Sequence, residues 1–333
     1  MSAAAASMYS PAAKQVAEKL GLKMGRANLE AFADTLHALA KADRNILAVT
    51  SDSRGSGKLG PFGQALPKQI VEVGIAEQNL VGVAAGLGSC GKKVFAVSPA
   101  CFLTARSLEQ IKNDICYSDH PVTLVGISGG VSYGALGTTH HSLHDFAVLR
   151  AINNITIVAP ADNTETREAV RICAVHDKPV YLRFGKAPLY TLPGADLPFA
   201  FGRARQMRAG ADVAFLATGE AVIHALLAAA HLAETTKLQC RVLSLPTVKP
   251  LDSAAVLSAA RECRAVITVE EHMVNGGLGE AVASILAQAG IATRFKIVGI
   301  PDEYTVTGSQ ADIFRHYGLS MEGLAATTQR LLG

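Results

Sequence analysis

The chain has 333 residues, of which 49% are hydrophobic and 18% charged, and its net charge is +3 at pH 7. This length predicts about two domains. The weak charge and the lack of any Lys/Arg run argue against nucleic-acid binding. No apolar run approaches about 18 residues, so we expect no membrane span. The abundance of Ala, Val, Leu and Gly is typical of an α/β protein with covered parallel strands.

The cysteines and the N-terminus indicate a cytoplasmic protein. The six cysteines are scattered and form no Cys-x-x-Cys pair, so we expect reduced, mostly buried thiols. The first residues lack the charged and apolar regions of a signal peptide. We expect residues 1–26 to form a tail or a short docking segment.

Residues 27–187 alternate strand and helix patterns and are expected to form the first domain. Predicted strands are 46–49, 70–73, 93–97, 122–127, 155–158 and 179–184. Predicted helices are 28–41, about 77–87, 105–117 and 164–175. Regular alternation of this kind predicts a mostly parallel, doubly wound sheet with right-handed crossovers.

A second α/β domain is expected at 211–333, after a linker at 188–210 that is low in periodicity. Its predicted strands are 213–216, 240–243, 265–269 and 294–298. Its predicted helices are 221–233, 254–264, 279–289 and 320–332. The fold class is therefore α/β, with two doubly wound, mostly parallel sheets.

Two Ser/Gly-rich loops follow predicted strands of the first domain. Residues 50–58 contain three Ser, two Gly and a Lys, and residues 126–145 are dense in Gly. Open α/β sheets bind ligands at the carboxyl ends of their strands. The first loop is equally compatible with a flexible surface loop, and its spacing is not that of a Walker loop. The second loop is too long to be a simple turn.

Glu77 is the first candidate for acid/base chemistry. It follows a strand and a turn at Gly74, and it opens a helix with no charged residue from Gln78 to Cys90. A carboxylate in a first helical turn ordinarily complements the helix dipole. At the mouth of an apolar helix, however, a desolvated carboxyl group can also exchange a proton with a ligand nitrogen.

Several motifs occur in an order that resembles the pyrimidine-binding domain of the transketolase family. The segment Gly74-Ile75-Ala76-Glu77-Gln78-Asn79 is the central one. The others are Ser51-Asp52, Ser98 with Gln110-Ile111-Lys112-Asn113, Gly134 to His140, Val158 to Asp162 and Pro179 to Lys186. Val269-Glu270-Glu271-His272 with Gly276-Gly277-Leu278-Gly279 resembles the family's C-terminal domain, so the resemblance covers about residues 27–331.

The resemblance also implies a missing half. Family members hold the coenzyme thiamine diphosphate through a metal ion bound at a Gly-Asp-Gly motif, which this sequence does not contain. It therefore looks like the C-terminal subunit of a split transketolase. We expect an N-terminal partner subunit to carry that motif and Mg²⁺ (or Ca²⁺ or Mn²⁺), in an α₂β₂ enzyme acting on sugar phosphates. No metal site is expected in this chain.

Residue roles follow from the resemblance by position. Glu77 matches the glutamate that hydrogen-bonds N1′ of the coenzyme's aminopyrimidine, and His140 matches the histidine that contacts the reacting hydroxyls of the substrate. Further coenzyme contacts are expected at Asp52, Ser53, Ile75, Ala100, Phe102 and Leu103. Further substrate contacts are expected at Ser56, Ser128, Arg183 and Lys186, with Ser56, Arg183 and Lys186 on loops at the phosphate end.

Three departures from the family pattern predict an atypical donor. Leu136 replaces an Asp that reads a sugar hydroxyl, and Ser128 replaces a frequent His. Ala100 or Leu103 stands where an aromatic residue stacks on the pyrimidine, so either Phe102 substitutes or the ring rests on aliphatic surface. An unusual phosphoketose such as apulose 4-phosphate, or a sulfosugar analogue, fits better than xylulose 5-phosphate.

Other interpretations remain open. His140, His141 and His144 are spaced like zinc ligands or like surface and capping residues. The chain is also similar to 1-deoxy-xylulose-5-phosphate synthase and to the E1 β subunit of 2-oxoacid dehydrogenases. A non-catalytic partner subunit is a further alternative.

Overall fold

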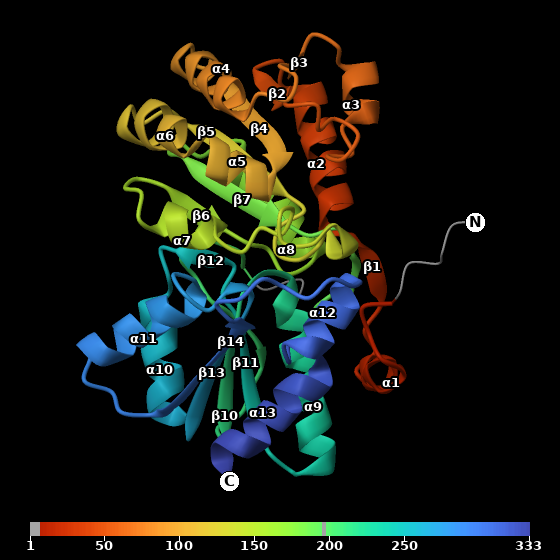
Figure 1. The fold of residues 1–333 in the computed structure, drawn as a ribbon, viewed down its shortest axis with the longest axis vertical. Coiled ribbons are helices and arrows are strands. Elements are labelled where there is room, and N and C mark those ends of the chain that lie inside the picture. Colours follow the sequence, from red (N-terminus) through yellow and green to blue (C-terminus); the bar gives the residue numbers. More distant parts are fainter. Residues whose placement is uncertain (1–6, 195–197) are drawn as a thin grey trace.

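The computed structural model describes residues 7–194 and 198–333 and contains two stacked α/β domains (Figure 1). The first domain has a seven-stranded sheet in the order β12-β6-β7-β5-β4-β2-β3. Its strands are β2 Ile46–Thr50, β3 Ile70–Glu72, β4 Lys93–Pro99, β5 Val122–Ile127, β6 Thr156–Val158, β7 Val180–Phe184 and β12 Thr247–Lys249. All pairs are parallel except β12 with β6. The edge strand β12, which the sequence did not predict, comes from the second half of the chain.

The helices of this domain cover both faces of the sheet (Figure 1). They are α2 Asn28–Ala42, α3 Gly60–Ala65, α4 Glu77–Ser89, α5 Ala100–Arg106, α6 Leu108–Gln110, π-helix η1 Ile111–Tyr117, 3₁₀-helix η2 Gly134–Leu136, α7 Asp145–Arg150 and α8 Asn163–Cys173. The prediction of one helix at 105–117 was wrong. The helix starts at Ala100 and is interrupted at Ser107, whose hydroxyl donates to the Leu103 carbonyl at 2.5 Å. Such i−4 back-bonding by Ser bends helices.

The second domain has a five-stranded sheet in the order β14-β13-β10-β11-β9. Its strands are β9 Arg205–Arg208, β10 Val213–Ala217, β11 Cys240–Ser244, β13 Ala265–Met273 and β14 Arg294–Ile300. Its helices are η3 Gly219–Ala221, α9 Val222–Thr235, α10 Ser253–Glu262, α11 Leu278–Gln288, α12 Gln310–His316 and α13 Met321–Leu332. The four predicted strands are confirmed. The antiparallel edge strand β9 lies inside the predicted linker and was missed.

The N-terminal segment is ordered against both domains from residue 7 onward. It forms α1 Pro11–Lys19 and β1 Met24–Ala27, and β1 pairs with β8 Pro188–Tyr190. Tyr9 is 4% exposed, and its ring lies 4.7 Å from that of Tyr190 and 5.3 Å from that of His224 on α9. A docking segment therefore describes this part better than a tail. Residues 1–6 of the expected tail and 195–197 of the expected linker lie outside the described residues.

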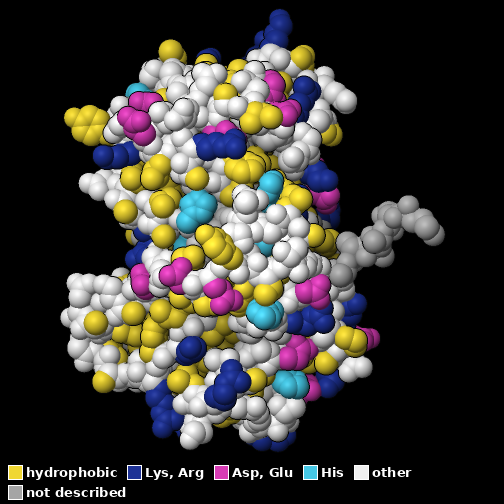
Figure 2. Space-filling view, viewed as in Figure 1, with side chains coloured by type: hydrophobic (Ala, Val, Ile, Leu, Met, Phe, Trp, Pro, Cys, Tyr) yellow, Lys and Arg dark blue, Asp and Glu magenta, His cyan; other side chains and the backbone are white. Residues whose placement is uncertain are grey.

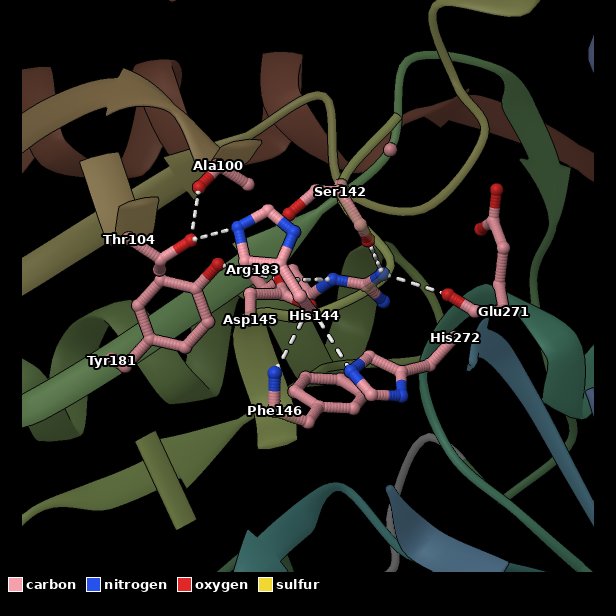
Figure 3. Close-up of polar contacts among 12 residues, drawn as sticks. Ala100, Thr104, Ser142, His144, Asp145, Phe146, Tyr181, Arg183, Glu271 and His272 are labelled. Carbon is pink, nitrogen blue, oxygen red and sulfur yellow. Dashed lines mark hydrogen bonds and ion pairs between the residues drawn. The ribbon is translucent and has the colours of Figure 1, made fainter. Parts of the chain in front are cut away.

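A buried charged cluster joins the two domains (Figure 3). Asp145 accepts from the Tyr181 hydroxyl at 2.7 Å and forms an ion pair with Arg183, 2.7 Å from Nε. Arg183 also donates to the Glu271 carbonyl of the second domain at 2.7 Å, and its guanidinium lies over the Phe146 ring. The cluster ties β7 and α7 of the first domain to β13 of the second.

Within residues 7–194 and 198–333, no helix combines the length and apolar character required to cross a membrane.

Candidate active site

Glu77 lies where the sequence placed it, in the first turn of α4. Strand β3 ends at Glu72, and the chain turns at Gly74, whose φ of +72° favours glycine. The Glu77 side chain is 4% exposed, and its Oε2 accepts from Arg106 Nη1 at 2.9 Å. The apolar helix therefore does bury this carboxyl group, and a cation on α5 accompanies it.

A cavity of about 490 Å³ opens directly beside this carboxyl group. It is lined by residues 75–79 and by Arg106. Ile75 is 72% exposed there, which is unusual for a large apolar side chain next to a buried charged group. A pocket with an apolar wall and one convergent polar group is typical of a site for a heteroaromatic ring. The geometry thus fits the pyrimidine ring of a coenzyme.

Phe102 is the aromatic residue available to this site. Its ring is half-buried, lies 5.4 Å from the His140 ring and is covered by Arg106, whose Cζ is 4.5 Å from the ring centroid. Ala100 and Leu103 are both fully buried, so their expected contacts with the coenzyme are wrong. Both side chains pack into the domain interior, which leaves Phe102 as the substitute.

His140 lies beside Phe102 at the end of the long glycine-rich loop. Its ring is half-buried, is edge-on to Tyr133 at 5.5 Å, and has Nδ1 3.0 Å from Thr139 Oγ1. It is thus held between two aromatic rings with one nitrogen directed elsewhere.

The neighbouring histidines have separate partners. His141 is buried between Thr305 Oγ1 (2.7 Å) and the Gly134 carbonyl (2.9 Å), and burial lowers its pKa. His144 Nε2 lies 3.2 Å from Thr104 Oγ1 (Figure 3). With His140 turned to Thr139, the three rings do not share a set of metal ligands.

The loop after β2 presents only part of its predicted contacts. Asp52 and Ser56 are exposed, and Asp52 has φ +50° with its N–H bonded to Glu72 Oε1 at 2.7 Å. Ser53 is 2% exposed and donates to the Val97 carbonyl at 2.7 Å, so its predicted contact with the coenzyme is wrong. The Ser53 hydroxyl holds the loop on β4 instead.

The predicted substrate residues divide in the same way. Arg183 was expected on a loop, but it lies in β7 with 6% exposure and its guanidinium is used in the domain cluster. Ser128 is fully buried with φ +56°. Both predictions of substrate contact are wrong, because these side chains face the interior of the protein.

Lys186 is half-buried and reaches the same region as His140. Its Nζ lies 4.4 Å from the centroid of the Tyr133 ring. Partial burial and then the nearby charge of Lys58 lower its pKa. Both Lys186 and Tyr133 line a second cavity of about 540 Å³, between the domains. The side chains are thus ordered as Glu77, Arg106, Phe102, His140, Tyr133 and Lys186 along one connected series of contacts.

Arg106 and Tyr133 are site residues that the sequence reasoning missed. Arg106 follows Phe102 by four residues, a spacing that places both on one helical face. That signal was obscured because the helix was predicted to start after Phe102. Figure 2 shows histidines and hydrophobic side chains gathered on the central part of the face that it displays.

Comparison with known proteins agrees with this geometry. Residues 25–191 match the transketolase pyrimidine-binding domain, and residues 202–324 match the transketolase C-terminal domain. One of the two apulose-4-phosphate transketolase subunits of Phocaeicola vulgatus is 48% identical over 90% of this chain and 95% of its own. The corresponding apulose-4-phosphate transketolase subunit of Actinobacillus succinogenes is 37% identical over 84% and 90%.

A solved split-gene transketolase, an inactive β4 tetramer, superimposes with a TM-score of 0.82 at 33% identity. The match covers 92% of this chain and 98% of the other. By contrast, 1-deoxy-D-xylulose-5-phosphate synthase of Syntrophotalea carbinolica is 34% identical, but this chain spans only 51% of it.

The fold and the site thus define a protein with a pyrimidine-binding domain of the kind that implies thiamine diphosphate. The chain belongs to the transketolase family. Within that family it is the C-terminal subunit of a split, two-subunit transketolase.

Proposed function

We propose that this subunit, with an N-terminal partner, transfers a two-carbon glycolyl unit from an atypical phosphoketose to an aldose phosphate. Apulose 4-phosphate is the donor that we favour, because the Phocaeicola and Actinobacillus relatives both carry that substrate in their names. Leu136 supports this choice. It is 55% exposed and replaces the acidic residue expected there, so it offers no hydrogen bond to a sugar hydroxyl.

The observation that carries the proposal is a buried carboxyl group that opens onto an exposed cavity. Glu77 is 4% exposed, yet the adjoining cavity is bordered by Ile75 at 72% exposure. When bound, thiamine diphosphate supplies the carbon centre that carries the two-carbon unit. Glu77 would hold a proton at the pyrimidine nitrogen N1′, and Phe102 with Ile75 would enclose the ring in an apolar setting.

His140 and Lys186 provide the substrate side of the site. His140 would contact the reacting hydroxyls, since it lies against Phe102 on one side and Tyr133 on the other. Lys186, beside Tyr133, would bind the substrate phosphate together with Ser56. Asp52 would border the coenzyme from the loop after β2.

The diphosphate would be held by the partner subunit. Binding a diphosphate requires a cation or a group of N–H donors, and we assign Mg²⁺ (or Ca²⁺ or Mn²⁺) to a Gly-Asp-Gly motif on that subunit. We further propose an α₂β₂ assembly with the coenzyme at the junction of subunits. A cytoplasmic location fits the cysteines, all six of which are free thiols in the described structure.

Substitution of Glu77 tests the catalytic role. In the complex with the partner subunit, Glu77→Gln should lower turnover of donor and acceptor by at least about 100-fold, because the group that holds the proton is lost. Size-exclusion chromatography should show unchanged assembly. Glu109→Gln, on α6, is the matched control. Normal turnover in Glu77→Gln would favour the non-catalytic alternative.

The substrate is tested separately on the wild-type complex. We expect apulose 4-phosphate to be used with a higher kcat/KM than xylulose 5-phosphate, with ribose 5-phosphate among the acceptors tried. The opposite order would contradict the proposed donor. Reduction of an artificial electron acceptor upon addition of pyruvate would instead indicate a 2-oxoacid dehydrogenase subunit.

A further inference from the structure

Arg106 lies where the coenzyme ring is expected to enter. We propose that Arg106 is a displaceable counter-ion that occupies the pyrimidine site of the free subunit and leaves when coenzyme binds. This inference rests on the proposed function of the site. It concerns a residue of this chain and a competition that precedes catalysis.

Arg106 occupies the site through two contacts that a bound ring would need. Its Nη1 donates to Glu77 Oε2 at 2.9 Å, and its Cζ lies 4.5 Å above the Phe102 ring. It also lines the cavity of about 490 Å³ beside Glu77. One side chain therefore covers both the carboxyl group that would meet the pyrimidine nitrogen and the aromatic face on which the ring would stack.

The chemistry of Glu77 makes this contact incompatible with coenzyme binding. The ring nitrogen N1′ is a hydrogen-bond acceptor, so the carboxyl group must present a proton to it. A guanidinium at hydrogen-bond distance favours the ionised carboxylate, which has no proton to donate. The pair with Arg106 and the bond to the ring nitrogen are therefore alternatives.

The setting of Arg106 is that of a movable side chain. Its side chain is 50% exposed, and Glu77 is its one hydrogen-bond partner within the described residues. Arg183 and Arg205, by contrast, are 6% and 3% exposed and bind carbonyl oxygens as well as carboxylates. Arg106 also ends α5, where the helix is interrupted at Ser107. Among the residues that the structure describes, only the two site contacts hold its guanidinium in place.

Coenzyme affinity measures the competition directly. Thiamine diphosphate would be titrated into the complex with the partner subunit, with Mg²⁺ present, and binding followed by calorimetry. An exposed ion pair and a cation–π contact together oppose binding by about 5- to 30-fold. Arg106→Met should therefore lower the Kd of thiamine diphosphate by about that factor. Arg171→Met is the matched control, since Arg171 is 56% exposed and pairs with Glu168 away from the site.

The outcomes separate this inference from the proposed function. An unchanged or higher Kd in Arg106→Met, with normal binding by the wild-type complex, would overturn the displacement of Arg106 alone. A wild-type complex that binds no thiamine diphosphate would overturn both. Thermal unfolding of the variant should match that of the wild type, which ensures that the Kd reports on the site.

Discussion

Glu77 and Arg183 are both charged and almost fully buried, but their surroundings give them different roles. Glu77 adjoins an open cavity and has one cationic partner at its edge. Arg183 is enclosed by Asp145, two backbone carbonyls and the Phe146 ring. A buried charge that keeps an exposed cavity beside it is available for chemistry, whereas one with all its partners inside the protein stabilises the fold.

Substitution of Arg183 should therefore affect stability. Arg183→Met leaves Asp145 buried without its counter-ion, and we expect the free energy of unfolding to fall by about 3–5 kcal/mol. Chemical denaturation followed by circular dichroism measures this. Lys186→Met, in contrast, should leave stability within about 0.5 kcal/mol and raise the KM for phosphorylated substrates. A stable Arg183→Met protein with a raised KM would restore Arg183 as a substrate ligand.

At the scale of elements, the segment around α1 shows how a short helix can be stabilised by packing. Nine residues are too few for a stable isolated helix. Ser10 caps its N-terminus, Val16 and Ala17 are buried, and Tyr9 inserts between Tyr190 and His224. The helix therefore depends on the second domain, while β1 joins the segment to β8.

Removal of the Tyr9 ring should weaken this docking. Tyr9→Ala deletes a large side chain that is 4% exposed, and we expect a loss of about 3 kcal/mol of stability. Thermal unfolding and limited proteolysis near residue 20 would show it. Leu20→Ala, at a position 37% exposed, should cost less than about 1 kcal/mol. Equal effects of the two changes would contradict a specific role for Tyr9.

At the scale of the whole molecule, buried carboxyl groups lie where the two domains meet. Glu220 Oε1 accepts from the Gly185 N–H at 2.9 Å and from Asn28 at 3.2 Å. Glu271 accepts from the Val131 N–H and from Gln310, both at 2.8 Å. Burial, then the charge of Glu271, raises the pKa of Glu220 to about 8. Burial also raises the pKa of Glu271 to about 7, although Arg183 opposes the shift.

These shifts predict a pH dependence of folding. Between pH 4.5 and about 8 the folded protein retains a proton on Glu220 that the unfolded chain has lost, so this residue's contribution to stability falls as pH rises. Glu220→Gln should resemble the wild type near pH 5 and exceed its stability near pH 8.5 by on the order of 2 kcal/mol. Chemical denaturation at several pH values measures the difference.

Two features make this measurement specific. The contribution of His224, whose pKa burial lowers to about 4, is present in both proteins and cancels. Glu109→Gln, on α6 and away from the domain junction, should show no pH-dependent difference. A constant difference between Glu220→Gln and wild type across the range would exclude the retained proton.

The sequence by itself determined the α/β class, the helix that begins at Glu77 and the position of most sheet strands, because periodicity and turn residues act over a few neighbouring residues. The order of motifs likewise predicted the pyrimidine-binding site and His140. Only the tertiary structure decided which way each side chain faces. Ala100, Leu103, Ser53, Ser128 and Arg183 occupy the expected stretches of chain, yet packing directs them inward.

The same distinction explains the missed elements. Strand β12 joins the sheet of the first domain from the second half of the chain, and β1 pairs with β8, which lies far along the chain from it. The pairing of Arg106 with Glu77 likewise joins two helices. Contacts of this kind arise from free energy gained between distant segments, which no local pattern records, and they decide where the site opens and what fills it.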